Sequence, residues 1–348
     1  MAVRPPLVEL TSCRAKEFLR EPEAIFWVFA FPVLLAIALG LAFRVKGPDK
    51  IPVGVVAVSP ADPAAARTLA ELGRSPALLA HRYSPESGQD ALRTGKISLL
   101  VEPGPPVVFR FDETRPDSRI ARLEADEALQ RAAGRRDAVP VRAEKVTEKG
   151  SRYIDFLIPG LLGMNLMGTG IWSLAFSVTT ARNRRILKRL IATPMRKSHY
   201  LLSQILGRLG FLIPELVILV GAGWLLFGVA VKGSLTLLFL TSLVGAMTFC
   251  GMGLLIASRV STIEGASGLA NLTMLPMWLL SGVFFSSERF PKAVQPLIDA
   301  LPLTALNQAL RGIITEGRGL GGIAPQLAIV ALWGLASFAV ALKIFRWR

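Results

Sequence analysis

The sequence predicts an α-helical protein that crosses a membrane several times and carries one small α/β domain between its first two spans. Two observations predict this class. Of the 348 residues, 52% are hydrophobic and only 19% are charged, whereas about a quarter are charged in an ordinary soluble protein. The hydrophobic residues also gather into runs of about 20, the length that an α-helix needs to cross about 30 Å of hydrocarbon.

Six such runs predict six membrane spans. A helix of a soluble protein usually keeps a polar face, whereas these runs are apolar on every side. The first run is too long for the apolar region of a signal peptide and lacks a small-residue cleavage site before Arg44. The predicted spans are Ala24–Phe43, Ile154–Thr180, Leu209–Val231, Leu235–Ala257, Ala266–Phe285 and Ile323–Ile344.

The distribution of Lys and Arg predicts that both termini are cytoplasmic. With that orientation the inside segments hold fifteen Lys and Arg residues and the short outside segments hold five, which is the positive-inside pattern. The formal net charge of +15 is then explained by contact with anionic lipid headgroups. No nucleic-acid partner is therefore expected.

Between the first two spans, residues 44–153 change to a polar composition and predict an extracytoplasmic α/β domain. Residues 1–43 then hold an amphipathic helix and the first span, and residues 154–348 hold the other five spans. Nothing in the sequence of the domain indicates its function, and shaping the exit or supporting dimerisation is an alternative to binding a ligand. Its predicted strands are 51–59, 97–102 and 107–111, and its predicted helices are 62–73, 84–95 and 117–133.

No sequence motif indicates that this chain is an enzyme. A phosphate-binding loop needs G-x-x-x-x-G-K-[ST], and Gly95–Lys96 is followed by Ile97 and lacks the first glycine at the required spacing. With only two cysteines, a disulfide scaffold and a four-cysteine metal site are excluded, and two histidines argue against a histidine-based metal centre. We expect no cofactor on this chain.

The loop 181–208 predicts a short amphipathic helix that ends at Pro194, because basic residues alternate with apolar ones at helical spacing. Residues 7–20 have a similar pattern. Two interpretations are open for the loop helix: it anchors in lipid headgroups, or it docks on a cytoplasmic partner.

Glu215 is the one acidic residue deep in a predicted span, about 9 Å into the hydrocarbon at 1.5 Å per residue. An unpaired charge there is costly, so Glu215 should pair with Arg208 or Arg259, or line a cavity. Segment 286–322 is too poor in apolar residues to span twice. We predict short re-entrant helices broken by Pro296 and Pro302, with a flat surface hairpin as the alternative.

Five segments resemble, in order, the permeases of type-two ATP-binding-cassette (ABC) exporters, and specifically their bacterial drug- and antibiotic-efflux branch. A departure is Ser286–Ser287, where many relatives carry a proline. The segments are REPEAIFWVFAFPVLLAIALGLAF (20–43), YIDFLIPGLLGMNL (153–166), RNRRILKRLIATPMRKSHYLLSQILGR (182–208), LPMWLLSGVFFSSERFP (275–291) and LPLTALNQALRGII (301–314).

The resemblance implies that two permease chains pair in the bacterial cytoplasmic membrane and that each binds a separate ATPase subunit, which holds ATP and Mg²⁺. Residues 183–195 would be the coupling helix, residues 7–20 the connecting helix and 260–264 a second contact, while 286–322 would be a re-entrant gate. The coupling residues would be Arg184, Arg185, Ile186, Leu187, Arg189, Leu190, Thr193 and Pro194.

The resemblance also implies that spans two and five line the path of an amphipathic or hydrophobic cargo such as a drug, an antibiotic or a lipid. Two other classes of function remain as alternatives: a proton-coupled secondary transporter that uses Glu215, and a membrane-anchored receptor. The expected cavity or gate residues are Met164, Asn165, Glu215, Asn271, Met274 and Trp278.

Overall fold

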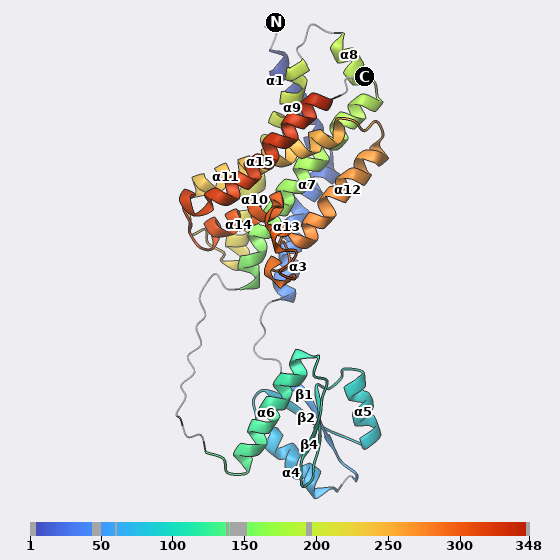
Figure 1. The fold of residues 1–348 in the computed structure, drawn as a ribbon, viewed down its shortest axis with the longest axis vertical. Helices are drawn as coiled ribbons and strands as arrows, with labels where there is room; N and C mark the ends of the chain where they lie inside the picture. Colours follow the sequence, from blue (N-terminus) through green and yellow to red (C-terminus); the bar gives the residue numbers. More distant parts are fainter. Residues whose placement is uncertain are drawn as a thin grey trace. The chain divides into compact units, whose positions relative to one another are not determined.

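A computed structural model of the chain describes residues 5–43, 50–59, 61–136, 139, 152–192 and 197–345. The chain divides into two compact units (Figure 1). We call Met1–Arg44 with Val146–Arg348 the helical unit, and Val45–Lys145 the α/β unit.

The helical unit begins with α1 (Pro6–Leu19), α2 (Pro22–Ile25), a π-helical turn η1 (Phe26–Ala30) and α3 (Phe31–Ala42). Its second half contains α7 (Tyr153–Asn183), α8 (Ile186–Ile191), α9 (Lys197–Leu209), α10 (Leu212–Phe227), α11 (Leu235–Ala257) and α12 (Ile263–Leu280). It ends with the 3₁₀ turn η2 (Ser287–Arg289), α13 (Gln295–Asp299), α14 (Pro302–Ile314) and α15 (Leu320–Ile344).

Within the described residues, five helical stretches are long and apolar enough to cross a membrane: Pro22–Ala42, Tyr153–Asn183, Ser198–Phe227, Leu235–Ala257 and Leu320–Ile344. The predicted fifth span, 266–285, is not among them. It corresponds to α12, whose 18 residues include Glu264 and Asn271 and which ends at Leu280, just before Gly282 with its left-handed φ of 67°.

The third span differs from its predicted bounds of 209–231. It starts eleven residues earlier, at Ser198, and ends at Phe227, because Gly228 is left-handed and caps α10. The stretch is also broken between α9 and α10, at residues 210 and 211. Pro214 has no amide hydrogen to donate to the carbonyl of residue 210, so one hydrogen bond of a continuous helix is missing at this break.

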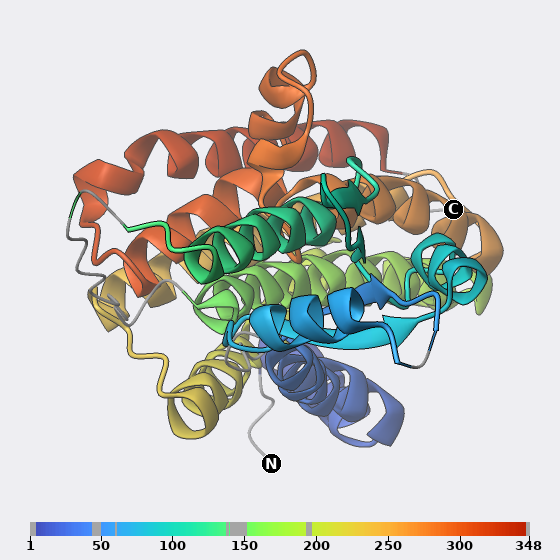
Figure 2. The same cartoon turned by 90° about the horizontal axis from the view of Figure 1, so that it is seen from below.

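Helix α7 is the centre of the helical unit, with 20 of its 31 residues buried. Figure 2 shows α7 between the N-terminal helices and α15. Glycines let the neighbouring backbones approach closely: a Cβ added to Gly253 on α11 would lie 2.7 Å from the carbonyl oxygen of Ile171, and one added to Gly160 would lie 2.6 Å from that of Val283.

Segment 286–322 is not a flat surface hairpin. Six apolar side chains of α14 have no exposed surface, and α14 packs on α7, α11, α12 and α15. The proline positions explain the breaks, because Pro296 lies in the first turn of α13 and Pro302 is the first residue of α14. The buried side chains are Leu303, Ala305, Leu306, Ala309, Leu310 and Ile313.

The α/β unit is a four-stranded sheet in the order β2-β1-β3-β4. Its strands are β1 (Ile51–Val56), β2 (Leu78–Tyr83), β3 (Leu99–Glu102) and β4 (Val108–Arg110). The first three are mutually parallel, and β4 is antiparallel to β3. Strand β2 was not predicted from the sequence. A parallel strand after the helix that follows β1 is nevertheless the usual arrangement, because the chain crosses over the sheet through that helix.

Helices cover both faces of this sheet (Figure 1). Helices α4 (Pro63–Leu72) and α6 (Pro116–Ala132) pack on the face of Val53 and Leu99, and α5 (Pro85–Arg93) packs on the face of Val56 and Leu100. The predicted start of α4 is confirmed, since Asp62 accepts hydrogen bonds from the amides of Ala64 and Ala65. The hydrogen bond from Ala65 is the main cause of the lowered pKa of Asp62.

Two identical substitutions test the packing of α11 on α7. Gly253→Ala places a methyl group against backbone carbonyls and should lower stability by about 1–3 kcal/mol, the usual cost of overpacking. In the second variant, Gly221→Ala on α10, the added Cβ has no neighbouring atom within 4 Å. This variant should leave the thermal unfolding midpoint of the detergent-purified protein unchanged or slightly raised. Equal midpoints for the two variants would contradict the close contact.

Candidate functional site

A cavity of about 700 Å³ lies within the helical unit, between the N-terminal helices, α7, α9 and α12. This volume is in the range of pockets that hold drug-sized ligands. Three ionisable residues line it, Arg14, Glu21 and Arg208. The rest of the wall is mostly apolar and includes seven aromatic residues: Phe18, Trp27, Phe31, Trp172, Phe176, Phe211 and Trp278.

One wall is built around the π-helical turn η1, which interrupts the first span. Such turns disturb the regular hydrogen bonding of a helix and are frequent at functional sites. Asn165 of α7 donates a hydrogen bond of 3.0 Å from Nδ2 to the carbonyl oxygen of Val28 within this turn. Asn165 therefore fixes η1 against α7 and lines the cavity at the same point.

A second wall contains a buried ion pair between α9 and α10. The Arg208 Nη2 atom lies 2.7 Å from a Glu215 carboxylate oxygen, and both side chains are at most 5% exposed. Thr169 of α7 contacts both partners, since its Oγ1 lies 3.3 Å from the other Glu215 oxygen and also accepts a hydrogen bond from Arg208. This group of three ties the two halves of the broken third span to α7.

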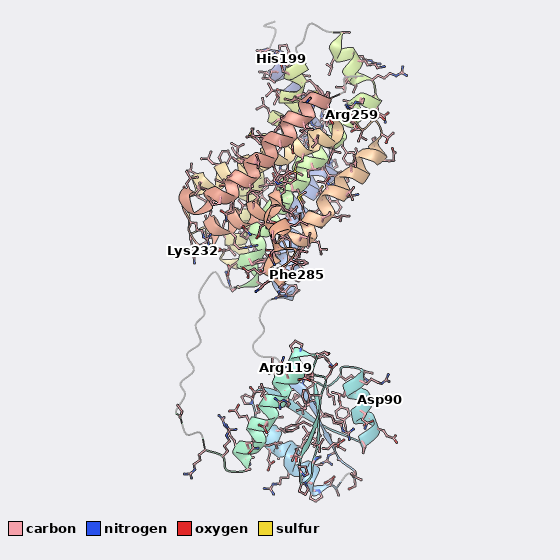
Figure 3. All side chains as sticks on the ribbon, in the orientation of Figure 1. Asp90, Arg119, His199, Lys232, Arg259 and Phe285 are labelled. Atoms are coloured by element: carbon pink, nitrogen blue, oxygen red, sulfur yellow. The ribbon has the colours of Figure 1, made fainter. Side chains whose placement is uncertain are left out.

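Glu215 thus pairs with Arg208, and not with Arg259. Figure 3 shows Arg259 at the end of the helical unit where His199 also lies. Arg208 lines the cavity, but Glu215 is not among the lining residues.

Four of the six expected cavity residues line this cavity: Met164, Asn165, Met274 and Trp278. Glu215 stands behind Arg208, and Asn271 is half-buried outside the lining. The contribution of the N-terminal segment was missed. The aromatic residues concentrated between Phe18 and Phe31 were the signal that could have found it.

Helix α1 reaches the cavity because it packs closely on α9. A Cβ added to Gly207 would lie 2.8 Å from Cγ of Arg14. Arg14 also lies 3.4 Å from the Oγ and the carbonyl oxygen of Ser173 on α7, and 2.7 Å from a carboxylate oxygen of Glu17.

The expected coupling helix is short: α8 covers Ile186–Ile191, after a left-handed Arg185 with φ 57°. Leu187 is 1% exposed and packs among Leu174, Val178 and Tyr200. It therefore anchors α8 and cannot contact a partner. Arg184, Arg185, Ile186 and Arg189 are exposed and Leu190 is half-buried, while Thr193 and Pro194 lie outside the described residues.

Arg182, in the last turn of α7 and four residues before α8, connects α7 to two other helices. Its guanidinium donates hydrogen bonds to the carbonyl oxygens of Ala257, Ser258 and Val260, where α11 ends. A cation at the C-terminal end of a helix satisfies carbonyls that have no partner within the helix. The same guanidinium lies 5.5 Å from the ring centre of Phe345, next to the end of α15.

The elements expected to face the cytoplasm lie at one end of the helical unit. Figure 1 places α1, α8 and the end of α15 there, and Figure 3 places His199 and Arg259 there. Lys232, in an expected outer loop, and Phe285, the last residue of the predicted fifth span, lie at the opposite end (Figure 3).

A family model for the ABC-2 family transporter protein matches residues 22–343. The chain belongs to this family. This confirms the resemblance seen in the five sequence segments. The molecule is thus an ABC transporter permease with several membrane helices.

Curated relatives of the permease include multidrug and resistance permeases. It is 27% identical over 197 residues to the probable multidrug ABC transporter permease YbhS of Escherichia coli strain K12, covering 55% of this chain and 50% of YbhS. It is 27% identical over 207 residues to the linearmycin resistance permease protein LnrN of Bacillus subtilis strain 168, covering 58% of this chain and 51% of LnrN.

A eukaryotic relative is ABC transporter G family member 20 of Dictyostelium discoideum, which is 28% identical over 172 residues. That match covers 49% of this chain and 23% of the relative. The permease thus aligns with about half or less of the length of these relatives.

At the opposite end of the permease, α14 holds the end of α12 through two polar side chains. Asn307 donates a hydrogen bond of 3.0 Å to the carbonyl oxygen of Ser281, and Arg311 donates one of 3.0 Å to that of Gly282. The Arg311 guanidinium also lies 3.8 Å from the ring centre of Phe156 on α7. These contacts fix the C-terminal end of α12 against α7 and α14.

A double-mutant cycle tests the ion pair. Arg208→Gln alone leaves a buried carboxylate and Glu215→Gln alone leaves a buried guanidinium, so each should lower the stability of the permease by roughly 3–5 kcal/mol. The double variant should lose much less than the two losses added together. Thermal unfolding in detergent measures all four proteins, and additive losses would show that the two side chains do not interact.

Proposed function

We propose that the permease is the membrane subunit of an ATP-driven exporter, that it pairs with a second permease chain, and that a separate ATPase subunit binds at α8. ATP and Mg²⁺ would be held by that subunit, and this chain would carry no cofactor. The geometry of α8 is the observation that carries this function.

Helix α8 has the properties of a docking element. The buried Leu187 anchors α8 to the helical unit. Arg182, four residues before α8, contacts the ends of α11 and α15. Arg189 on the helix, and Arg184 and Arg185 just before it, are exposed to solvent and form a basic face. A force applied to this basic face would therefore reach three membrane helices and not only a loop.

The proposal includes a topology. The end with α1, α8 and Arg259 faces the cytoplasm of a bacterium, and residues 44–153 lie on the outer side. Helix α12 completes the set of six spans as the fifth in chain order: its 18 residues extend about 27 Å at 1.5 Å per residue. Residues 286–322 form the re-entrant gate, with α14 as its buried part.

We propose that the cargo is an amphipathic or hydrophobic molecule such as a drug, an antibiotic or a lipid. The aromatic lining of the 700 Å³ cavity supports this class. The names of YbhS, a probable multidrug permease, and LnrN, a linearmycin resistance permease, point the same way.

The proton-coupled alternative relied on Glu215 as an unexplained buried acid. Its contacts with Arg208 and Thr169 account for a buried charge without proton transport. We therefore keep the ATP-driven function as the single proposal.

Charge reversal on α8 and just before it tests the docking. Arg184→Glu with Arg189→Glu should reduce the amount of ATPase subunit that copurifies with the tagged permease by about tenfold or more, because charge reversal at an interface costs several kcal/mol. Copurification from native membranes in mild detergent, quantified by ATP hydrolysis per permease, measures the effect.

The matched control is Arg289→Glu with Lys292→Glu, a double charge reversal at two exposed residues of the outer segment. It should retain the ATPase fully. Equal retention by the two variants would refute docking at α8. Leu187→Asp is not a useful probe, since it places a charge in the core and is expected to destabilise the permease itself.

A further inference from the structure

The cavity wall holds buried hydrogen-bond donors that have no partner. The Nε and Nη1 atoms of Arg208 lack an acceptor, and so does the indole Nε1 of Trp278. Arginine and tryptophan side chains can only donate hydrogen bonds. Among the described residues that line the cavity, every buried side-chain polar atom without a partner is a donor.

Buried donors without acceptors are costly and uncommon in native proteins. The ion pair with Glu215 does not satisfy Arg208, because Glu215 and Thr169 both contact the same nitrogen, Nη2. A guanidinium with unpartnered N–H donors on two of its nitrogens is well suited to bind a carboxylate, sulfonate or phosphate group.

A second guanidinium borders the same cavity. Arg14 of α1 contacts Ser173 only at 3.4 Å, and its short contact is with Glu17, which is 56% exposed. Glu21 is the one carboxylate among the lining residues, and it is exposed to solvent. The charged groups of the cavity lining that are shielded from solvent are therefore arginine side chains, and aromatic side chains line much of the rest of the cavity.

We infer that the cavity binds an amphiphile with an aromatic or alkyl body and an anionic, oxygen-bearing head. Arg208 and Trp278 donate hydrogen bonds to the head, and the aromatic side chains pack on the body. This inference specifies the cargo class of the proposed exporter and rests on that function for its role in transport. The binding itself depends only on the permease chain.

Two fluorescent probes with the same aromatic body test the inference. 8-Anilinonaphthalene-1-sulfonate carries an anionic head, and N-phenyl-1-naphthylamine lacks it. Binding to the purified permease in uncharged detergent is followed by energy transfer from tryptophan, with Trp27, Trp172 and Trp278 in the wall. The sulfonate should bind about tenfold more tightly, after subtraction of its binding to empty micelles.

Two variants assign the head-binding group. Arg208→Gln with Glu215→Gln removes the guanidinium without changing the net charge and should cancel the preference for the sulfonate, with the neutral probe bound as before. Trp278→Phe keeps the ion pair and the aromatic packing, and should weaken binding of the sulfonate about threefold while leaving the neutral probe unaffected. Arg152→Gln with Asp155→Asn is the matched control, since this pair is also hydrogen-bonded but does not line the cavity.

Equal affinity of the wild-type permease for the two probes would overturn the inference, and so would a preference for the sulfonate that survives both cavity variants. If the double variant fails to fold, Trp278→Phe alone decides between these outcomes. None of these binding measurements depends on an ATPase. The proposed export function could therefore be refuted while the anion site is confirmed, and the anion site could be refuted while the export function is confirmed.

Discussion

The helical unit depends on one constraint: inside hydrocarbon, every polar group has to find its partner within the protein. The unit departs from regular helix at several places, and a polar side chain is present at most of them. Asn165 bonds the carbonyl of Val28 in the π-helical turn, Arg182 bonds the carbonyls at the end of α11, and Asn307 bonds the carbonyl of Ser281 at the end of α12. Two of these three residues lie on α7.

This arrangement makes α7 the connection between the cavity and α8, the two regions for which we propose a function. One stretch of α7, from Met164 to Phe176, lines the cavity, and its last turn carries Arg182 and leads into α8. Because α7 is continuous between them, a displacement of α8 is transmitted to the cavity wall by a rigid element. The Thr169 contact with Arg208 and Glu215 adds the third span to the same body.

Patterns that depend on neighbouring residues in the chain predicted well. The apolar runs, the Asp62 cap and the proline breaks around α13 and α14 could all be found in the sequence. Features that depend on distant residues could not. Strand β2 is defined by its pairing with β1, Leu187 is buried in a cluster that includes residues of α7, α9 and α11, and Phe18 reaches the cavity because α1 packs on α9. Glu215 combines the two kinds of feature. Its need for a partner was predictable from the sequence, but the choice of Arg208 over Arg259 depends on the break between α9 and α10 at residues 210 and 211.

The most direct test of the central claim is a photo-cross-linking residue placed at position 189 on α8 in native membranes, with position 292 on the outer segment as the comparison. Docking of an ATPase on α8 predicts a covalent adduct between position 189 and an ATP-hydrolysing subunit, with no such adduct at position 292. Adducts with lipid alone at position 189 would contradict the claim and would identify α8 as an interfacial anchor.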